Sequence, residues 1–282
     1  MREMNLRAHR WSRRSTIVAA IVAATVVGGG VAYAATAQPA IHTWTPKSAD
    51  QVTNLDVLRQ QIRNYYGDPL GTGTFAANGN YAKEATKVAH EGARWLKAKE
   101  PTGHQKKAIV LDVDDTTLTT WNYELVSNWA YNPTTNATYV NGQLFPATPG
   151  MVDMVTQAAH EGYAIFWITG RPVTQAAATL GNLGADGIGV DAGYPAPTTL
   201  PDGSSGLFTK PAVANYPDYL KAACANDPNG ACTTIHYKSA TRAYIESLGY
   251  DIVASFGDQY SDLTGGFADR TFKMPNPNYY LP

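Results

Sequence analysis

The sequence contains little cysteine and no excess of charge of either sign. Its 282 residues include 2 cysteines, and 22 lysines and arginines almost balance 23 aspartates and glutamates. A near-neutral chain has no broad basic surface, so its charge indicates neither a nucleic-acid partner nor a membrane partner. The two cysteines, Cys224 and Cys232, have only His236 nearby and no second cysteine pair, which argues against a zinc site.

The sequence also lacks an apolar run that is long and unbroken enough to span a bilayer well. The best candidate, residues 17–27, is short and is followed by three glycines. Five arginines precede it and small residues follow it, which is the pattern of a secretory signal peptide. We therefore predict a signal peptide over residues 1–37, cleaved between Ala34 and Ala37, and no stable membrane anchor. An uncleaved anchor is the alternative, and the Ser-Arg-Arg at residues 12–14 points to the twin-arginine route, with general secretion left open.

The rest of the chain shows no internal repeat, no low-complexity tract and no phosphate-binding P-loop pattern in its glycine-rich segment at residues 67–79. We assign residues 38–47 to a linker and residues 48–282 to one domain. Two segments near its start, residues 55–65 and 81–95, carry apolar residues at helical spacing. We expect them to form an N-terminal helical extension.

The predicted domain is organised around a short apolar run that breaks into carboxylates. Residues 108–111 have the composition of a buried strand, and Asp112, Asp114 and Asp115 follow at once. Because isolated charge is too costly in a core, these side chains must lie where the strand leaves the sheet. Clustered carboxylates call for a cation, and oxygen ligands favour Mg²⁺ or Ca²⁺.

Strands and helices alternate along the remaining sequence, although residues 121–149 look irregular. We expect strands at residues 163–168, 252–256 and 271–274, a short strand near 207–209, and helices at 151–160, 172–183, 216–224 and 239–248. This alternation predicts an α/β fold with a doubly wound, mostly parallel sheet. Right-handed crossovers bring the carboxyl ends of such strands to one edge, where ligands bind.

Polar side chains at the expected strand ends suit phosphoryl transfer. A phosphate dianion repels a carboxylate nucleophile, and a divalent cation together with a lysine removes that repulsion. One carboxylate can then attack phosphorus while a second protonates the leaving oxygen. The residues at these positions are Asp112, Asp114, Thr169, Asp258 and Asp262, with Lys238 opening a helix before the third strand.

Four motifs resemble those of the haloacid-dehalogenase-like (HAD) phosphohydrolases. They are Asp-Val-Asp-Asp-Thr at 112–116, Ile-Thr-Gly-Arg-Pro at 168–172, Tyr-Lys-Ser-Ala-Thr-Arg at 237–242 and Gly-Asp-Gln-Tyr-Ser-Asp-Leu at 257–263. With the tail Phe-Lys-Met-Pro-Asn-Pro-Asn-Tyr-Tyr at 272–280, they resemble the acid phosphatases of subfamily IIIB, a group with class B and class C acid phosphatases and plant vegetative storage proteins. The resemblance runs from about residue 55 to the C-terminus. It implies a HAD-like, Rossmannoid fold without a large cap domain.

The resemblance also implies roles for the carboxylates. Asp112 is expected to be the nucleophile that forms an aspartyl-phosphate, and Asp114 the general acid and base, oriented by Thr116. The side chains of Asp112 and Asp258 and the carbonyl of Asp114 are expected to bind Mg²⁺. Asp262 is expected in support, either of Lys238 or of a metal-bound water. The segment at residues 119–123 departs from the family pattern, so the choice of substrate stays open.

The phosphoryl group is expected to lie between two strand ends. The resemblance implies that Thr169 and the backbone of Gly170 hold it on one side and Lys238 on the other. For Arg171 two alternatives are open, contact with substrate or an ion pair that ties down its loop. Tyr123 is expected at the mouth of the site, where stacking would favour nucleoside monophosphates and aryl phosphates, unless its ring is buried in the core.

Two expectations concern other residues. Asp115 has the character of a solvated turn residue without a role in the chemistry. Cys224 and Cys232 flank the turn-forming residues 226–230, and we expect a disulfide between them in an oxidising compartment, with two free thiols as the alternative.

The expected function is that of a secreted, Mg²⁺-dependent acid phosphatase acting on small-molecule phosphate monoesters. A non-catalytic storage or binding protein on the same fold and a phosphotransferase are the alternatives. No nucleic-acid partner is expected, and the oligomeric state is open.

Overall fold

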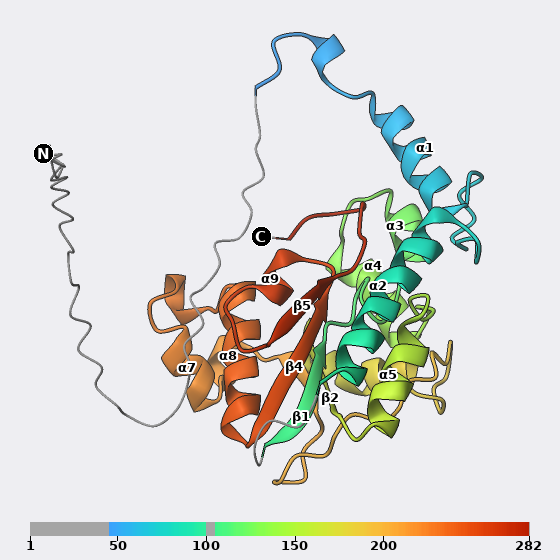
Figure 1. Ribbon diagram of the computed structural model, residues 1–282. Coiled ribbons are helices and arrows are strands. Elements are labelled where there is room, and N and C mark those ends of the chain that lie inside the picture. Colours follow the sequence, from blue (N-terminus) through green and yellow to red (C-terminus); the bar gives the residue numbers. More distant parts are fainter. Residues whose placement is uncertain (1–44, 100–104, 282) are drawn as a thin grey trace, which may run out of the picture. The chain divides into compact units, whose positions relative to one another are not determined.

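Among the described residues, five strands form a single sheet in which every neighbouring pair is parallel. The computed structural model describes residues 45–99 and 105–281 (Figure 1), which belong to the compact unit Ala32–Pro282. The predicted signal peptide, residues 1–37, and most of the predicted linker lie outside the described residues. The order in the sheet is β3-β2-β1-β4-β5, with β1 at Lys106–Leu111, β2 at Ala164–Pro172, β3 at Leu207–Lys210, β4 at Tyr250–Gly257 and β5 at Arg270–Lys273.

The sheet is buried on both faces because apolar residues fill its central strands. In β1, Ile109 and Leu111 belong to one apolar cluster, whereas Ala108 and Val110 belong to another. Successive residues of a strand point to opposite faces, so the two clusters are the two sides of the sheet. Near-continuous apolar strands of this kind are typical of parallel sheets covered by helices. The structure confirms the predicted α/β fold.

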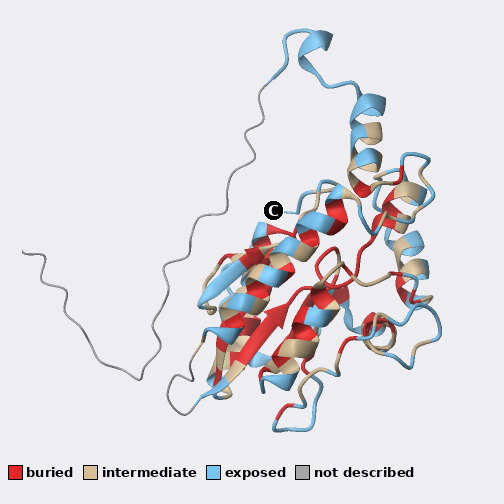
Figure 2. Cartoon of the chain, turned by 45° about the vertical axis from the view of Figure 1, so that its right-hand side comes forward, coloured by how far each residue is buried: buried red, intermediate tan, exposed pale blue. Residues whose placement is uncertain are grey.

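Helices cover both faces of this sheet (Figure 1). Helices α2 and α5 supply residues to the cluster on one face, and α7 and α8 supply the other. A Cβ added at Gly92 in α2 would lie 2.6 Å from the ring of Phe256, so glycine lets α2 pack closely against β4. In Figure 2 the helices beside the sheet are buried on one side and exposed on the other. The helices are α1 Leu55–Tyr66, α2 Asn80–Lys97, α3 Trp121–Ser127, α4 Pro133–Asn141, α5 Met151–His160, α6 Ala176–Leu183, α7 Asp218–Ala223, α8 Thr234–Ser247 and α9 Tyr260–Leu263.

Helices α1 and α2 form the predicted N-terminal extension. The side chain of Asn54 caps α1 by accepting the N–H groups two and three residues on. At the other end of α1, the ring of Tyr66 stacks on Trp121 with 4.1 Å between centroids, and on Tyr81 with 4.3 Å. Leu55, in the first turn, is 56% exposed. Helix α1 is therefore attached to the domain through the aromatic rings at its C-terminal end, whereas α2 packs directly on the sheet.

Three predicted element boundaries are wrong. Residues 121–149 are not irregular, because α3 and α4 lie there, and the Asn132 side chain and Pro133 provide the start of α4. Pro172 ends β2 instead of beginning a helix, and a 3-10 helix at Val173–Gln175 leads into α6. Helix α8 begins before Lys238, because the side chain of Thr233 caps it by accepting the N–H of His236. Lys238 thus lies in the second turn of α8.

Within the part of the chain that the structure describes, no second sheet is inserted. The segment between β1 and β2 holds α3, α4 and α5, and the segment between β2 and β3 holds α6 and a long loop. This agrees with the expectation that a large cap domain is missing. Among the same residues, no helix combines the length and the apolar character needed to cross a membrane.

Candidate active site

The chain turns sharply after β1 and places Asp112 at the carboxyl edge of the sheet. The N–H of Asp112 donates to the carbonyl of Phe256 in β4 (3.0 Å), so the pairing of β1 with β4 continues up to this residue. The N–H groups of Thr117 and Leu118 then both donate to the carbonyl of Val113, at 3.0 and 2.9 Å. Asp112 is 7% exposed. The first predicted site residue therefore lies where the sequence places it, at a buried strand end.

Lys238 joins two of the predicted carboxylates. Its Nζ donates to Oδ1 of Asp112 and to Oδ1 of Asp262, at 2.5 Å in each case. The other oxygen of Asp262 accepts the N–H of Gln259 (2.9 Å) and so caps α9. Gly257 permits this approach, because a Cβ there would lie 2.3 Å from the Cβ of Asp262. Asp262 therefore supports Lys238, which is one of the two roles predicted for it.

The carboxylates of Asp112, Asp258 and Asp262 are buried, and one oxygen from each lies within 4.8 Å of the others. Among the described residues, Lys238 is the cation that makes ion pairs with this group. Burial and the neighbouring carboxylates raise the pKa of Asp258 well above its usual range, and burial raises the pKa of Asp112 to about 7 although Lys238 opposes the shift. Three buried carboxylates with one lysine leave uncompensated negative charge, which is costly. The cluster could therefore hold a metal ion, and its all-oxygen donors suit a hard cation.

Arg171 holds the side chain of Asp114. Its Nη2 and Nε donate to the two carboxylate oxygens at 2.7 and 3.0 Å, and its Nη1 donates to Thr179 Oγ1 at 3.0 Å. Arg171 is buried, whereas the Asp114 side chain is 30% exposed. A bidentate guanidinium–carboxylate pair fixes both position and orientation. Of the two alternatives for Arg171, the structure contains the ion pair.

Two predicted site residues are placed differently from the prediction. The hydroxyl of Thr116 donates to Asp258 Oδ1 (3.3 Å), so Thr116 orients Asp258 and not Asp114. Tyr123 is 1% exposed, and its hydroxyl donates to the carbonyl of Asn132 (3.0 Å). Because the segment that carries it is the helix α3, its ring is turned into the core, where it packs against Tyr139. Tyr123 therefore does not stand at the mouth of the site.

Asp115 is not the solvated turn residue that was predicted, because it is completely buried. Its carboxylate accepts the N–H and the hydroxyl of Thr120 at 3.0 and 2.5 Å. Burial raises its pKa to about 6 against these hydrogen bonds. Its φ of 51° is in the left-handed region, which aspartate tolerates better than most residues. Asp115 thus holds the turn after β1 in shape.

The end of β2 supplies the remaining predicted phosphate-binding residues. Thr169 is buried, and its hydroxyl accepts the N–H of Arg171 at 3.2 Å. Gly170 is exposed, and a Cβ added to it would meet no atom within 4 Å. An open backbone beside a hydroxyl leaves room for a bound group at this strand end. Their contact with phosphate stays a prediction.

A disulfide links Cys224 and Cys232, eight residues apart, between α7 and α8. It lies just before the helix that carries Lys238, and Lys210 Nζ donates to the carbonyl of Cys232 at 2.9 Å. The disulfide therefore restrains the chain segment that leads into α8.

Two further donors to Asp258 were not found from the sequence. Gln259 Nε2 and Asn276 Nδ2 donate to Asp258 Oδ2 at 2.6 and 2.7 Å. Both residues lie in segments that the sequence marks as family features, at 257–263 and 272–280. The bond from Asn276 could not be predicted from the sequence, because the two residues are 18 positions apart and their contact depends on the path of the tail.

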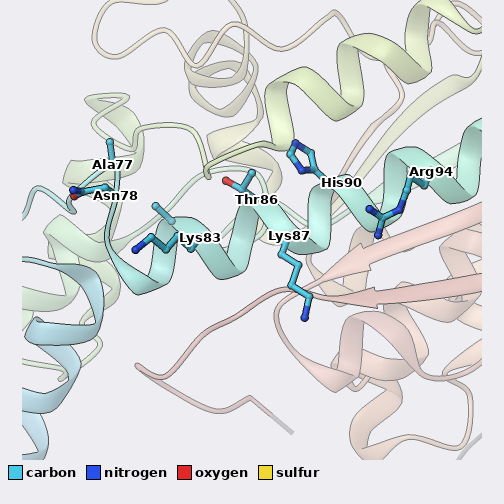
Figure 3. A pocket seen from close by; sticks show the side chains of 8 residues that line it. Ala77, Asn78, Lys83, Thr86, Lys87, His90 and Arg94 are labelled. Carbon is cyan, nitrogen blue, oxygen red and sulfur yellow. The ribbon is translucent and has the colours of Figure 1, made fainter.

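A separate hollow of about 470 Å³ runs along α2 and is lined by Lys83, Lys87, His90 and Arg94, among others (Figure 3). It contains none of the carboxylates described above. The hollow is therefore not part of the carboxylate site.

Comparison with known proteins gives the family of this chain. The pattern of the family described as "HAD superfamily, subfamily IIIB (Acid phosphatase)" matches residues 32–282. The chain belongs to this family. The acid phosphatases are phosphoric monoester hydrolases, and the predicted family and enzyme class are thereby confirmed.

Two plant proteins and one bacterial structure are similar to this acid phosphatase family member. The chain is 27% identical to the "Stem 28 kDa glycoprotein" of Glycine max over 72% of this chain and 71% of that protein. It is 24% identical to "Acid phosphatase 1" of Solanum lycopersicum over 71% of this chain and 69% of that protein. The class C acid phosphatase of Bacillus anthracis shares the fold, with a TM-score of 0.54 at 21% identity over 79% of this chain and 86% of that one.

Proposed function

We propose that this protein is an exported, Mg²⁺-dependent acid phosphatase that hydrolyses small-molecule phosphate monoesters through an aspartyl-phosphate. The observation that carries the proposal is the buried group of Asp112, Asp258 and Asp262 around Lys238, at the carboxyl edge of a parallel sheet. Such a group provides a nucleophile, oxygen ligands for a cation and a positive charge for phosphate in one place.

In the proposed reaction, an oxygen of Asp112 attacks the phosphorus of the ester. The bond from phosphorus to the ester oxygen breaks, and the leaving oxygen takes a proton from the carboxyl group of Asp114. Water then attacks the phosphorus of the aspartyl-phosphate and gives its proton to Asp114. The acyl phosphate bond breaks, inorganic phosphate leaves, and Asp112 is restored.

Arg171 and Lys238 position these two carboxylates. The two hydrogen bonds from the guanidinium of Arg171 fix Asp114 in one orientation, and the ammonium of Lys238 donates a hydrogen bond to Asp112. We assign phosphate binding to Lys238, to the hydroxyl of Thr169 and to the backbone of Gly170. Charge-assisted donors at these positions would stabilise the negative charge that develops on the phosphoryl oxygens.

The donor set fits Mg²⁺. The side chains of Asp112 and Asp258 and the carbonyl of Asp114 would hold the ion, while Asp262 is already occupied by Lys238 and the N–H of Gln259. When bound, Mg²⁺ would neutralise the repulsion between the phosphate dianion and the Asp112 carboxylate.

Export is supported by the disulfide, since such bonds persist in oxidising compartments, and by the plant glycoproteins among the relatives. The predicted signal peptide, of either the general or the twin-arginine type, would provide the route. Alkylation of the native exported protein tests this part, because it should find no reactive thiol.

A non-catalytic storage protein is the competing function. "Vegetative storage protein 1" of Arabidopsis thaliana is 46% identical over 56 residues, which are 20% of this chain and 21% of that protein. A screen of phosphate release from nucleotides, sugar phosphates and an aryl phosphate, with and without a chelator, decides between them. We expect release that depends on a divalent metal. No release from any ester would favour storage, and transfer to an added alcohol would indicate a phosphotransferase.

A further inference from the structure

We propose that the C-terminal tail completes the metal site, with Asn276 as a positioning residue for Asp258. This inference rests on the proposed function, because it takes Asp258 as a ligand of the metal. The tail, residues 274–281, leaves β5 as extended chain, dark red in Figure 1, and contains no helix or strand. The N–H of Met274 donates to the carbonyl of Gly257 at 2.8 Å, and after this residue side-chain contacts lead the tail to the carboxylate cluster.

Asn276 connects the tail directly to Asp258. Its Nδ2 donates to Asp258 Oδ2 at 2.7 Å, and its Oδ1 accepts the N–H of Asn278 at 2.8 Å. These two partners fix which end of the amide faces the carboxylate. Gln259 Nε2 donates to the same oxygen of Asp258 at 2.6 Å. Oδ2 of Asp258 thus accepts two amide donors. Among the described residues, Oδ1 accepts only the hydroxyl of Thr116, at 3.3 Å, and is therefore the oxygen that we expect to face a cation.

The tail is anchored away from Asp258 as well. Asn278 Nδ2 donates to the hydroxyl of Tyr66 (2.9 Å), and Trp129 Nε1 donates to Asn278 Oδ1 (3.2 Å). These anchors hold the tail in place without touching Asp258. Asn276 and Asn278 therefore differ in role although they are two residues apart.

Hydrogen bonds to a metal-binding carboxylate orient it, and losing such a partner commonly weakens metal binding by about 10–100-fold. Asn276 and Asn278 make a matched pair for testing this. Each alanine variant removes one tail amide and its hydrogen bonds, but Asn276→Ala alone removes a donor from Asp258. Binding of Mn²⁺, measured by electron paramagnetic resonance without substrate, reports the metal affinity of the site independently of turnover. We expect the Mn²⁺ dissociation constant to rise roughly tenfold or more in Asn276→Ala and to stay within about threefold of wild type in Asn278→Ala.

A serine variant keeps the test valid if Asn276→Ala does not fold. The hydroxyl of Asn276→Ser can still accept the N–H of Asn278, but it is too short to reach Asp258. Equal weakening by the Asn276 and Asn278 variants would overturn the proposal, because the tail would then act only on stability. Unchanged Mn²⁺ binding in folded Asn276 variants would overturn it too. Asp258→Asn identifies which claim has failed: if it also binds Mn²⁺ normally, the proposed metal site is wrong, and if it does not bind, the tail inference alone is wrong.

Discussion

Buried carboxylates define the site at the scale of single residues. Asp112, Asp115, Asp258 and Asp262 are all less than a tenth exposed, and Lys238 is the cation among them. Each buried charge without a partner costs several kcal/mol, so protons, hydrogen bonds or a bound cation must compensate the group. The stability of the protein should therefore depend on pH in a way that particular residues control.

Glu124 provides the clearest test of that dependence. It is 8% exposed, and burial, with smaller effects from Asp115 and Asp114, raises its pKa to about 8 from 4.5. The folded state holds this proton more tightly than the unfolded state, so the stabilisation is complete below about pH 4.5 and is lost as pH rises through about 8. We expect the free energy of unfolding in urea to fall by up to a few kcal/mol between about pH 5 and 8.

The Glu124→Gln variant should remove the part of this slope that Glu124 contributes, because glutamine does not titrate. The buried carboxyl groups of Asp112, Asp115 and Asp258, whose pKa values are also raised, should keep the rest of the slope. Glu161→Gln, which changes an exposed carboxylate, is the control and should leave the slope as it is in wild type. An unaltered slope in Glu124→Gln would show that other groups cause the pH dependence.

Arg171 is predicted to act on turnover more than on substrate binding, because its guanidinium holds Asp114 with both donors. Arg171→Lys keeps the positive charge but cannot make both hydrogen bonds to the Asp114 carboxylate. We expect kcat to fall about tenfold or more, with a smaller change in KM. Steady-state kinetics on an aryl phosphate measures both constants. A raised KM with an unchanged kcat would instead indicate that Arg171 binds the substrate.

At the scale of elements, α8 determines where the ammonium group of Lys238 lies. Lys238 projects from its second turn, and the segment before α8 is closed by the disulfide between Cys224 and Cys232. The hydroxyl of Tyr216 accepts the N–H of Cys232 at 3.2 Å, which fixes the same segment to the chain before α7. Loosening this region should affect the placement of Lys238 as well as stability.

The double substitution of Cys224 and Cys232 by serine measures the contribution of the bridge. A disulfide that closes a loop of about this length contributes roughly 2–3 kcal/mol in the loop-entropy account. We expect the free energy of unfolding to fall by about that amount and KM for a phosphate ester to rise. Wild type in reductant should behave in the same way. Equal stability of the bridged and serine forms would contradict the expectation.

At the scale of the whole molecule, the sequence predicted the sheet and its polar edge well. Strand runs such as residues 108–111 are apolar throughout, and the carboxylates that follow them mark the strand ends. The sequence predicted less well where a side chain's direction depends on distant packing. The burial of Tyr123 follows from α3 being a helix, and the contact of Asn276 with Asp258 follows from the path of the tail.

Metal binding should stabilise the folded molecule if the cluster binds Mg²⁺. A ligand at about 100 times its dissociation constant adds roughly 2.7 kcal/mol, which corresponds to about 5–10 °C in Tm for a chain of this size. We expect Mg²⁺ to raise the Tm of wild type by about that much and to have no effect on Asp258→Asn. A thermal shift assay with chelated protein as the baseline provides the measurement. An equal rise in the variant would place the ion elsewhere.

Turnover by Asp112→Asn tests the central claim, that Asp112 is the nucleophile of a phosphatase. Asparagine has nearly the same shape but cannot form the aspartyl-phosphate, so the account predicts that kcat on an aryl phosphate falls by about 10⁴-fold or more while the fold and its Tm survive. A folded variant that keeps more than about a tenth of the wild-type rate would contradict it.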